Sequence, residues 1–153
     1  MIIKICFVCH GNICRSPMAE FWFKELLRQR GIENEYVVES RATSTEEIGN
    51  PPHRGTIRKL AEYGIVPAGK RAIQLTRADY EKYDLIIGMD SANMRNILRI
   101  TGPDKQNKVR KLPEFAGSGK DIADPWYTGD FDETFADISE GCDGLLKFLG
   151  IQK

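Results

Sequence analysis

The 153-residue sequence lacks a long hydrophobic run and a net charge, and it has few cysteines and histidines. No apolar segment approaches the ~20 residues of a membrane-spanning helix, so no span is predicted. The 22 basic residues balance 22 acidic ones, and the isoelectric point is about 6.7. Nucleic-acid binders normally carry a basic stripe, so we expect no nucleic-acid partner. Residues 1–8 show neither a basic leader nor a small-residue cleavage site, which favours a cytoplasmic protein.

Cysteine and histidine are scarce, and their spacing favours neither structural disulfides nor a metal site. The sequence holds four cysteines and two histidines: Cys6, Cys9, Cys14, Cys142, His10 and His53. Structural disulfides are rare in an α/β chain of intracellular character. Cys9 and Cys14 lack the second pair of close ligands that zinc requires, so we predict no metal and no cofactor. Cys6 and Cys142 are expected in the core, because free cysteine behaves as a small hydrophobe.

Strand-like and helix-like segments alternate along the chain. Apolar and β-branched runs predict strands at residues 2–8, 36–38, 84–89 and 108–112. Helices are predicted at residues 16–31, 51–63, 91–100 and 132–149, with Ser16 and Ser91 as N-caps and a long loop over 113–129. The length favours one domain, 1–153, and the alternation favours a parallel sheet covered on both faces. Ligands of such sheets bind outside the carboxyl ends of the strands, which points to the loop after the first strand.

That loop carries a cysteine, five further residues, an arginine and a serine. In order, its residues are Cys9, His10, Gly11, Asn12, Ile13, Cys14, Arg15 and Ser16. Five residues can wrap backbone N–H groups around one tetrahedral oxyanion, and the following helix N-terminus adds donors and positive dipole. Gly11 and Asn12 tolerate the positive φ that such a loop demands, and Arg15 can donate two parallel bonds to phosphate. We therefore predict that residues 10–14 and Ser16 bind phosphate, with His10 contributing its backbone N–H rather than a catalytic imidazole.

Cys9 lies where the same donors would favour a thiolate over a thiol, and Ser16 can donate its hydroxyl to that thiolate. A thiolate inside a phosphate-shaped loop is a nucleophile for phosphoryl transfer. The competing interpretation is a buried cysteine at a strand end, followed by an ordinary capped helix. Cys-x5-Arg spacing alone is common by chance. Its place between a strand and a helix start, with glycine and asparagine inside, favours the catalytic interpretation.

Three segments together resemble the low-molecular-weight protein tyrosine phosphatases. They are residues 8–20, residues 87–90 (Ile-Gly-Met-Asp) and residues 122–127 (Ile-Ala-Asp-Pro-Trp-Tyr), and the resemblance extends over essentially the whole chain. It implies a three-layer α/β/α fold with a central four-stranded parallel sheet and the phosphate-binding loop after strand 1. It also implies metal-free hydrolysis of phosphate monoesters through a phosphocysteine intermediate on Cys9.

Asp124 is the candidate for the second half of the reaction. Expelling an alkoxide or phenoxide needs an acid, and the same group must later deprotonate water. By residue type alone, an aspartate before a proline is more often a turn former. The resemblance instead implies that Asp124 is the general acid and base.

Trp126 and Tyr127 are expected to wall the cleft, although Trp126 could equally pack the loop against the sheet. Tyr127 also resembles a position that is phosphorylated in some members of the family.

The resemblance implies supporting roles for three more residues. Cys14 is expected to be a redox partner that forms a reversible disulfide with Cys9 and protects it from irreversible oxidation. Asp90 resembles a residue that braces the phosphate loop from below, whereas its alternative role is an ordinary helix N-cap. Asn12 is expected to orient the loop through side-chain hydrogen bonds.

The sequence departs from the family pattern at two places. Eukaryotic members usually carry a cleft-walling aromatic where this chain has Thr45-Glu46-Glu47, which predicts poor use of acidic phosphopeptides. Those members also carry a histidine near the position of Gly69 and Lys70 that supports the phosphate loop. None is present here, so the Ser16–Asn12 network must be completed differently.

Three rival functions fit parts of the pattern. An arsenate reductase on this scaffold needs two further cysteines after the third strand, and residues 70–100 contain none. Phosphoarginine phosphatases of the family tend to carry threonine at the position of Ile13 and smaller residues after the Asp-Pro pair. A non-catalytic phosphate-binding module would need neither Cys9 nor Asp124. We predict a metal-independent, cysteine-dependent enzyme, most simply a monomer, that hydrolyses phosphotyrosine in proteins and small aryl phosphates.

Overall fold

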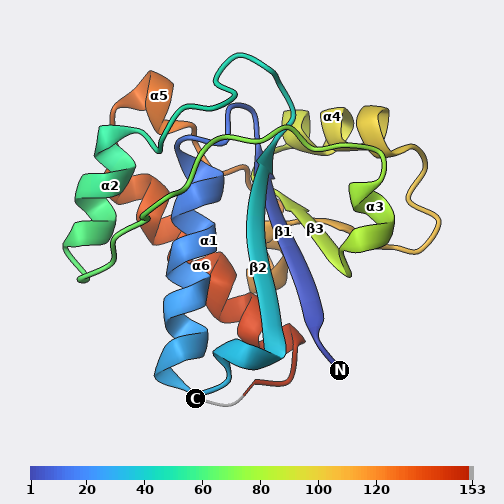
Figure 1. Ribbon diagram of the computed structural model, residues 1–153, viewed down its shortest axis with the longest axis horizontal. Helices are drawn as coiled ribbons and strands as arrows, with labels where there is room; N and C mark the ends of the chain where they lie inside the picture. The colour runs from blue at the N-terminus through green and yellow to red at the C-terminus, as the bar shows by residue number, and fades with distance from the viewer. Residues whose placement is uncertain (152–153) are drawn as a thin grey trace.

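Within the described residues, 1–151, the computed structural model contains a four-stranded parallel sheet in the order β2-β1-β3-β4. The strands are β1 (Ile3–Cys9), β2 (Tyr36–Ala42), β3 (Leu85–Gly88) and β4 (Val109–Lys111). β1 pairs in parallel with both β2 and β3, and β3 pairs with β4 (Figure 1). All four carboxyl ends therefore meet at one edge of the sheet, as the predicted fold class requires.

Helices cover both faces of this sheet (Figure 1). They are α1 (Arg15–Gln29), α2 (Arg54–Ala61), α3 (Asp79–Lys82), α4 (Ser91–Thr101), α5 (Pro125–Thr128) and α6 (Phe131–Phe148). Two 3₁₀ turns, η1 (Glu33–Glu35) and η2 (Leu112–Ala116), complete the regular structure. α1 and α6 pack on one face of the sheet, whereas α3 and α4 pack on the other. Among residues 1–151, no helix is long and apolar enough to cross a bilayer.

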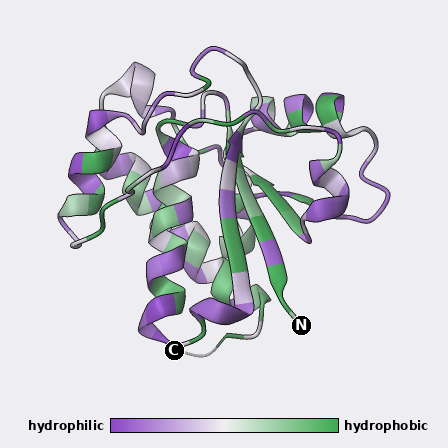
Figure 2. Ribbon diagram, in the orientation of Figure 1, coloured by the Kyte–Doolittle hydropathy of each residue, from purple (hydrophilic) through white to green (hydrophobic). Residues whose placement is uncertain are grey.

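The alternation of side chains along β1 builds both layers of the core. Ile5 and Phe7 point into the cluster shared with α1 and α6, whereas Cys6 and Val8 point into the cluster shared with α3 and α4. All four are fully buried, and fully burying a large aliphatic or aromatic side chain contributes about 1.5–3 kcal/mol. In Figure 2, β1 and β3 are mainly hydrophobic, whereas β2 and the helices carry both hydrophobic and hydrophilic residues. Burial also raises the pKa of the Cys6 thiol, in keeping with its predicted place in the core.

Cys142 was likewise expected in the core, and the structure confirms it. Its side chain is fully buried in α6, within the cluster that α6 shares with α1, and burial raises the pKa of its thiol. Both outlying cysteines are therefore protonated packing groups.

The two predicted serine N-caps are wrong. α1 begins at Arg15, one residue before Ser16, and the hydroxyl of Ser16 lies beside Cys9 instead of capping the helix. α4 begins at Ser91, and its cap is Asp90, whose Oδ1 accepts from the backbone N–H of Asn93 at 2.7 Å. An ionised carboxylate accepts a stronger bond at the positive end of a helix than a hydroxyl does, which explains the preference for Asp90.

The strand at 36–38 was predicted too short, and the loop at 113–129 is more ordered than predicted. β2 runs on to Ala42, and the loop contains η2 and the single-turn helix α5. η2 lies against α6 at Gly141 and Gly144, where a Cβ on Gly144 would overlap the carbonyl of Phe115. Both glycines thus allow the backbone that leads to Asp124 to pack closely on α6. Helices of one turn are too short to show an apolar period, as α3 also illustrates.

Candidate active site

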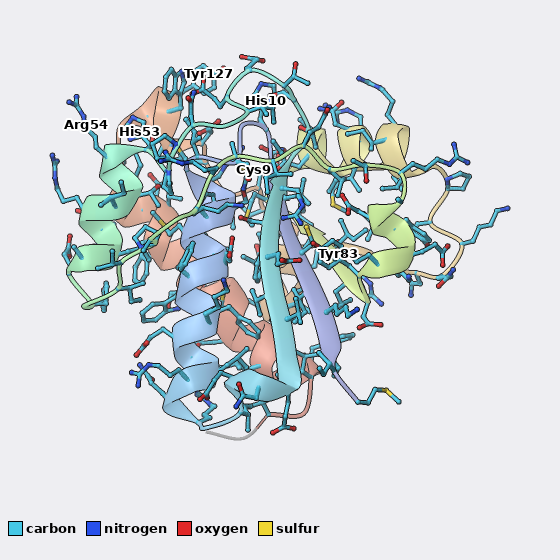
Figure 3. The ribbon with its side chains drawn as sticks, in the orientation of Figure 1. Cys9, His10, His53, Arg54, Tyr83 and Tyr127 are labelled. Atoms are coloured by element: carbon cyan, nitrogen blue, oxygen red, sulfur yellow. The ribbon has the colours of Figure 1, made fainter. Side chains whose placement is uncertain are left out.

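The candidate site lies at the carboxyl edge of the sheet, where β1 ends in the loop of residues 9–15. Figure 3 shows Cys9, His10 and Tyr127 gathered at this end of the molecule. One pocket is lined by most of the predicted site residues together with two glutamates: Cys9, His10, Gly11, Ile13, Cys14, Arg15, Glu46, Glu47, Asp124, Trp126 and Tyr127. Asn12 and Ser16 are absent from this lining because both are fully buried beneath the loop.

The loop takes its tight turn at Asn12, which adopts φ 58°. The expected positive φ at Gly11 is wrong, because only Asn12 of this pair adopts it. A Cβ at Gly11 would meet the Glu47 side chain at 3.4 Å, an ordinary contact. Glycine is therefore not required there by the backbone conformation. Asparagine is among the few side-chain-bearing residues that occupy the left-handed region readily.

Cys9 is buried at the floor of the pocket, with an exposed fraction of 3%. Its Sγ lies 3.0 Å from Ser16 Oγ and 3.4 Å from the backbone nitrogen of Ser16. The backbone N–H of Ser16 belongs to the first turn of α1, whose N-terminal donors are free of intrahelical bonds. The sulfur therefore receives donors from the first turn of α1.

Neighbouring bonds determine which way the hydroxyl of Ser16 points. The carbonyl oxygen of the Asn12 side chain accepts from Ile73 N at 3.1 Å, which fixes the orientation of the amide. Asn12 Nδ2 then donates to Ser16 Oγ at 2.8 Å and to Ser40 Oγ at 2.9 Å. Because Ser16 Oγ already accepts from Asn12, its own proton is available to donate to Cys9 Sγ.

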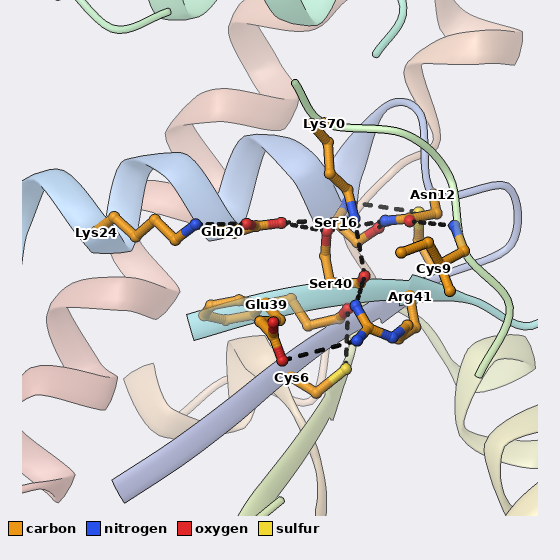
Figure 4. A network of polar contacts seen from close by, with 12 residues as sticks. Cys6, Cys9, Asn12, Ser16, Glu20, Lys24, Glu39, Ser40, Arg41 and Lys70 are labelled. Atoms are coloured by element: carbon orange, nitrogen blue, oxygen red, sulfur yellow. Dashed lines mark hydrogen bonds and ion pairs between the residues drawn. The ribbon is translucent and has the colours of Figure 1, made fainter. Parts of the chain in front are cut away.

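The network continues through Ser40 to charged residues between α1 and β2 (Figure 4). Ser40 Oγ donates to Glu20 Oε1 at 2.5 Å, a short bond typical of a hydroxyl on an ionised carboxylate. Lys24 pairs with Glu20 at 2.7 Å, and Lys70 approaches the same carboxylate at 3.8 Å. Each donor of the chain from Glu20 to Cys9 thus has a defined acceptor.

Lys70 and Glu20 lie next to the Ser40 end of this network. The Nζ of Lys70 donates to the backbone carbonyl of Ser40 at 2.9 Å, directly beneath the loop. Burial lowers the pKa of Lys70, and the nearby Glu20 carboxylate opposes that effect. The predicted completion of the network by another group is therefore confirmed, with a buried lysine–glutamate pair as that group.

One edge of the Arg15 guanidinium bonds to other protein groups, and the opposite edge faces the pocket. Nη1 donates to Asp90 Oδ2 at 2.7 Å and to the carbonyl of Ile122 at 2.8 Å. The opposite edge carries Nε, which finds no partner among residues 1–151, and Nη2, which lies 3.5 Å from Asp124 Oδ2. Burial opposes the charge of Arg15, but Cys9 and Asp90 outweigh burial and raise its pKa. A rigid cation thus presents the edge that binds two phosphate oxygens.

Asp90 and Asp124 hold this arginine from two different segments. Asp90 performs both predicted roles, because one oxygen caps α4 and the other braces Arg15. Asp124 caps α5 by accepting from the backbone N–H of Trp126 at 3.1 Å. Its side chain is one-quarter exposed at the pocket mouth. Asp124 thus lines the same pocket as Cys9.

Aromatic and acidic side chains form the rim. Trp126 and Tyr127 line the pocket, and their exposed fractions of 57% and 84% show that neither is packed into the core. Trp126 stands edge-on to His53, with ring centroids 5.7 Å apart. His10 Nε2 lies 2.6 Å from Glu46 Oε2, so its imidazole faces the rim and away from the sulfur. No role for His53 was predicted, and only the tertiary structure brings it to the rim.

Cys14 is a free thiol inside the loop, as are the other three cysteines. Burial, reinforced by Cys9 and Asp124, raises the pKa of Cys14 to about 12. It is therefore protonated at neutral pH. Among residues 1–151, no group of three histidine, cysteine, aspartate or glutamate side chains is arranged to hold a metal ion.

Sequence reasoning missed Glu20, Ser40 and the carbonyl of Ile122. Glu20 lies one helical turn after Ser16 on α1, and this spacing was the only local signal for it. Ser40 and Ile122 come from distant segments that meet the loop only through the sheet. The fold and the site thus define an α/β protein whose cysteine- and arginine-bearing loop lies at the carboxyl end of a parallel strand.

Comparison with known proteins names the family. Residues 4–153 match the family model of the low molecular weight phosphotyrosine protein phosphatases, and the chain belongs to this family. It is 36% identical to the low molecular weight protein-tyrosine-phosphatase YfkJ of Bacillus subtilis, over 99% of each chain. It is 40% identical to PtpA of Staphylococcus epidermidis, over 97% of this chain and 94% of that one.

Solved structures agree with the sequence comparison. The crystal structure of Bacillus subtilis YfkJ superposes with a TM-score of 0.94 at 36% identity, over 98% of this chain and 96% of that chain. SP-PTP, a low molecular weight protein tyrosine phosphatase from Streptococcus pyogenes, gives a TM-score of 0.86 at 42% identity, over 97% and 93%. The resemblance found in the sequence is therefore confirmed.

Proposed function

We propose that the protein hydrolyses phosphotyrosine through a phosphocysteine intermediate on Cys9. The observation that carries this proposal is the convergence of three groups on one pocket. The buried Cys9 sulfur, the free edge of Arg15 and the one-quarter exposed Asp124 carboxyl all line it. They supply a nucleophile, a clamp for phosphate oxygens and a proton donor, the three parts that phosphate ester cleavage requires.

In the first step the Cys9 thiolate attacks phosphorus. The sulfur–phosphorus bond forms as the bond between phosphorus and the tyrosine oxygen breaks, and Asp124 gives its proton to the departing phenoxide. Arg15 and the backbone N–H groups of the loop stabilise the charge on the three remaining oxygens. In the second step water attacks phosphorus, Asp124 accepts the proton of that water, and the bond to sulfur breaks. The products are tyrosine and inorganic phosphate, and no metal ion takes part.

The rim favours an aryl substrate. Trp126 and Tyr127 stand exposed on one side of the pocket, where they can flank a phenyl ring, and Ile13 adds an apolar contact. Ile13 and Tyr127 are larger than the residues expected for a phosphoarginine phosphatase. The arsenate reductase relay lacks its cysteines in residues 70–100. A binding module has no use for Asp124 beside the nucleophile.

Cys14 is the proposed redox partner of Cys9. A disulfide would form if Cys9 were oxidised to the sulfenic acid and Cys14 attacked that sulfur with loss of water. The pKa of about 12 at Cys14 makes its thiolate rare, so we expect the disulfide to form slowly at neutral pH.

The decisive experiment measures hydrolysis of p-nitrophenyl phosphate at about pH 6 in the presence of EDTA. The unmodified protein is expected to turn over, and Cys9→Ser is expected to lose turnover while retaining phosphate binding. Cys142→Ala is the matched control, because it removes a core cysteine far from the pocket. Loss of activity on chelation, or turnover by Cys9→Ser, would contradict the mechanism.

A further inference from the structure

Two glutamates, Glu46 and Glu47, stand at the mouth of the pocket in the segment that follows β2. Backbone bonds fix this segment to the loop of residues 9–15. The N–H groups of Thr43 and Ser44 donate to the carbonyls of Cys9 and His10, each at 3.0 Å. At its far end Gly49 donates to the carbonyl of Ala72 at 2.9 Å. The two carboxylates are therefore held in a defined place above the phosphate loop.

The charge of this rim is opposite to that of the floor. Glu46 is 68% exposed at its side chain and pairs with His10, whereas Glu47 accepts from the neutral amide of Asn50 at 3.1 Å. A contact with a neutral amide leaves the charge of Glu47 uncompensated. Among the described residues that line the pocket, Arg15 is the one lysine or arginine, and it lies at the bottom. The pocket is thus positive at its base and negative at its mouth.

An independent observation places the anion of the ligand at the base. Arg15 is 2% exposed, and its Nε has no partner within residues 1–151 although it faces the pocket edge beside Asp124. Buried donors normally have a partner, so this N–H is available to bind a ligand oxygen. A phosphate held there directs its tyrosine ring outward between Trp126 and Tyr127. The residues next to that tyrosine then lie at the level of Glu46 and Glu47.

We propose that Glu46 and Glu47 make the enzyme select phosphotyrosine segments that carry lysine or arginine beside the phosphotyrosine. The selection rests on the proposed function, since the phosphate must sit on Arg15 for the flanking residues to meet the rim. Flanking cations gain attraction from the two carboxylates, and flanking aspartates or glutamates are repelled. The proposal thus names the substrate class, basic phosphotyrosine peptides, and the two residues that recognise it.

The expected size of the preference follows from the exposure of the rim. Exposed ion pairs are weak and are screened by salt, so kcat/KM should favour a lysine-flanked over a glutamate-flanked peptide by about three- to tenfold at low ionic strength. The preference should shrink towards unity at about 0.5 M salt. A preference set by aromatic packing would persist under the same conditions.

The test uses three phosphotyrosine peptides of equal length with lysine, glutamine or glutamate on both sides of the phosphotyrosine. The ratio of kcat/KM between the lysine and glutamate peptides is measured for the unmodified protein and for Glu46→Gln/Glu47→Gln. The matched control is Glu33→Gln/Glu35→Gln, an equal charge change at η1, at the opposite end of β2. We expect the rim variant to abolish the preference and the control to retain it.

Two outcomes separate the possible failures. An enzyme that hydrolyses p-nitrophenyl phosphate but treats the three peptides equally, or keeps its preference in Glu46→Gln/Glu47→Gln, would overturn the rim proposal alone. No hydrolysis of any substrate would show that the proposed function itself has failed. A preference for the glutamate peptide would reverse the assigned sign and reject the rim proposal as well.

Discussion

The floor of the pocket is held together by buried hydrogen bonds, whereas its rim is exposed to solvent. Beneath the loop, Asn12, Ser16 and Ser40 are fully buried and joined in a directed chain of hydrogen bonds. At the mouth, Glu46 and Tyr127 are mostly exposed and make few contacts. A buried polar group without a partner costs about 1–3 kcal/mol, whereas an exposed pair contributes at most about 1 kcal/mol. The floor therefore tolerates little change, and the rim can vary with the substrate.

This difference assigns separate tasks to the two regions. A rigid, dry floor aligns the nucleophile and the arginine to within the tolerance that chemistry demands. A wet rim adds modest, salt-dependent preferences among substrates that all carry the same phosphate. Variants of the floor should change turnover for every substrate, and variants of the rim should change only the ratio between substrates.

The largest effect is expected from Arg15→Lys. A single ammonium cannot bond Asp90, the Ile122 carbonyl and two phosphate oxygens at once, so kcat/KM should fall about a hundredfold to a thousandfold. Hydrolysis of p-nitrophenyl phosphate measures this loss. Arg28→Lys, at an exposed arginine of the same helix, serves as the control. Near-normal activity of Arg15→Lys would show that a point charge suffices at the floor.

Asp124→Asn tests the acid role of a residue that lies between the floor and the rim. If Asp124 protonates the leaving group, phenyl phosphate should slow by about a hundredfold or more, because phenoxide is a poor leaving group. p-Nitrophenyl phosphate, whose leaving group is stable without a proton, should slow much less. Asp130→Asn, which alters the cap of α6 in the same segment, is the control. Equal slowing of both substrates would rule out the acid role.

Among these variants, Glu20→Gln is expected to have the smallest effect on turnover. It tests the hydrogen-bond network that runs from Glu20 to Cys9. A neutral amide polarises Ser40 less than a carboxylate does, so alkylation of Cys9 by iodoacetamide at about pH 6 should slow severalfold. Removal of the carboxylate beside the buried Lys70 should also destabilise the fold by about 1–3 kcal/mol in urea unfolding. Glu25→Gln, at a glutamate of α1 that pairs with Arg28 outside the network, is the control. Unchanged alkylation would show that the network positions the loop without acting on the sulfur.

The sequence predicted the elements that depend on contiguous residues. The loop of residues 9–15 was visible because a strand, a turn and a helix start follow one another directly in the chain. The strands at residues 2–8 and 84–89 were found because burial on both faces leaves nearly uninterrupted apolar runs, whereas the polar residues after Val38 concealed the second half of β2. The N-cap of α1 is Cys14, two residues before the predicted Ser16, and the N-cap of α4 is Asp90, one residue before the predicted Ser91. The Ser16 hydroxyl bonds Cys9 and Asn12, and Asp90 also bonds Arg15, partners that local capping rules do not include.

The role of Asp124 cannot be predicted from the residues next to it in the chain. Its role was expected only through the resemblance, because an aspartate before a proline has no local signal for catalysis. The structure brings it to the pocket through η2, which packs against glycines of α6, and through its bond to Arg15. Trp126 likewise reaches the rim next to His53, a residue more than 70 positions earlier in the chain.

The sequence by itself determined the fold class, the family and the identity of the phosphate loop. The fold class follows from the apolar periodicity of the strands and helices, and the loop and the family are identified by motifs of adjacent residues. The tertiary structure decided what supports that loop and what faces its substrate. Lys70, Ser40 and Glu20 come from three segments, and they meet only when β2 aligns beside β1 and α1 packs across both. Hydrogen bonds and ion pairs act over a few ångströms, so their partners are set by packing rather than by position along the chain.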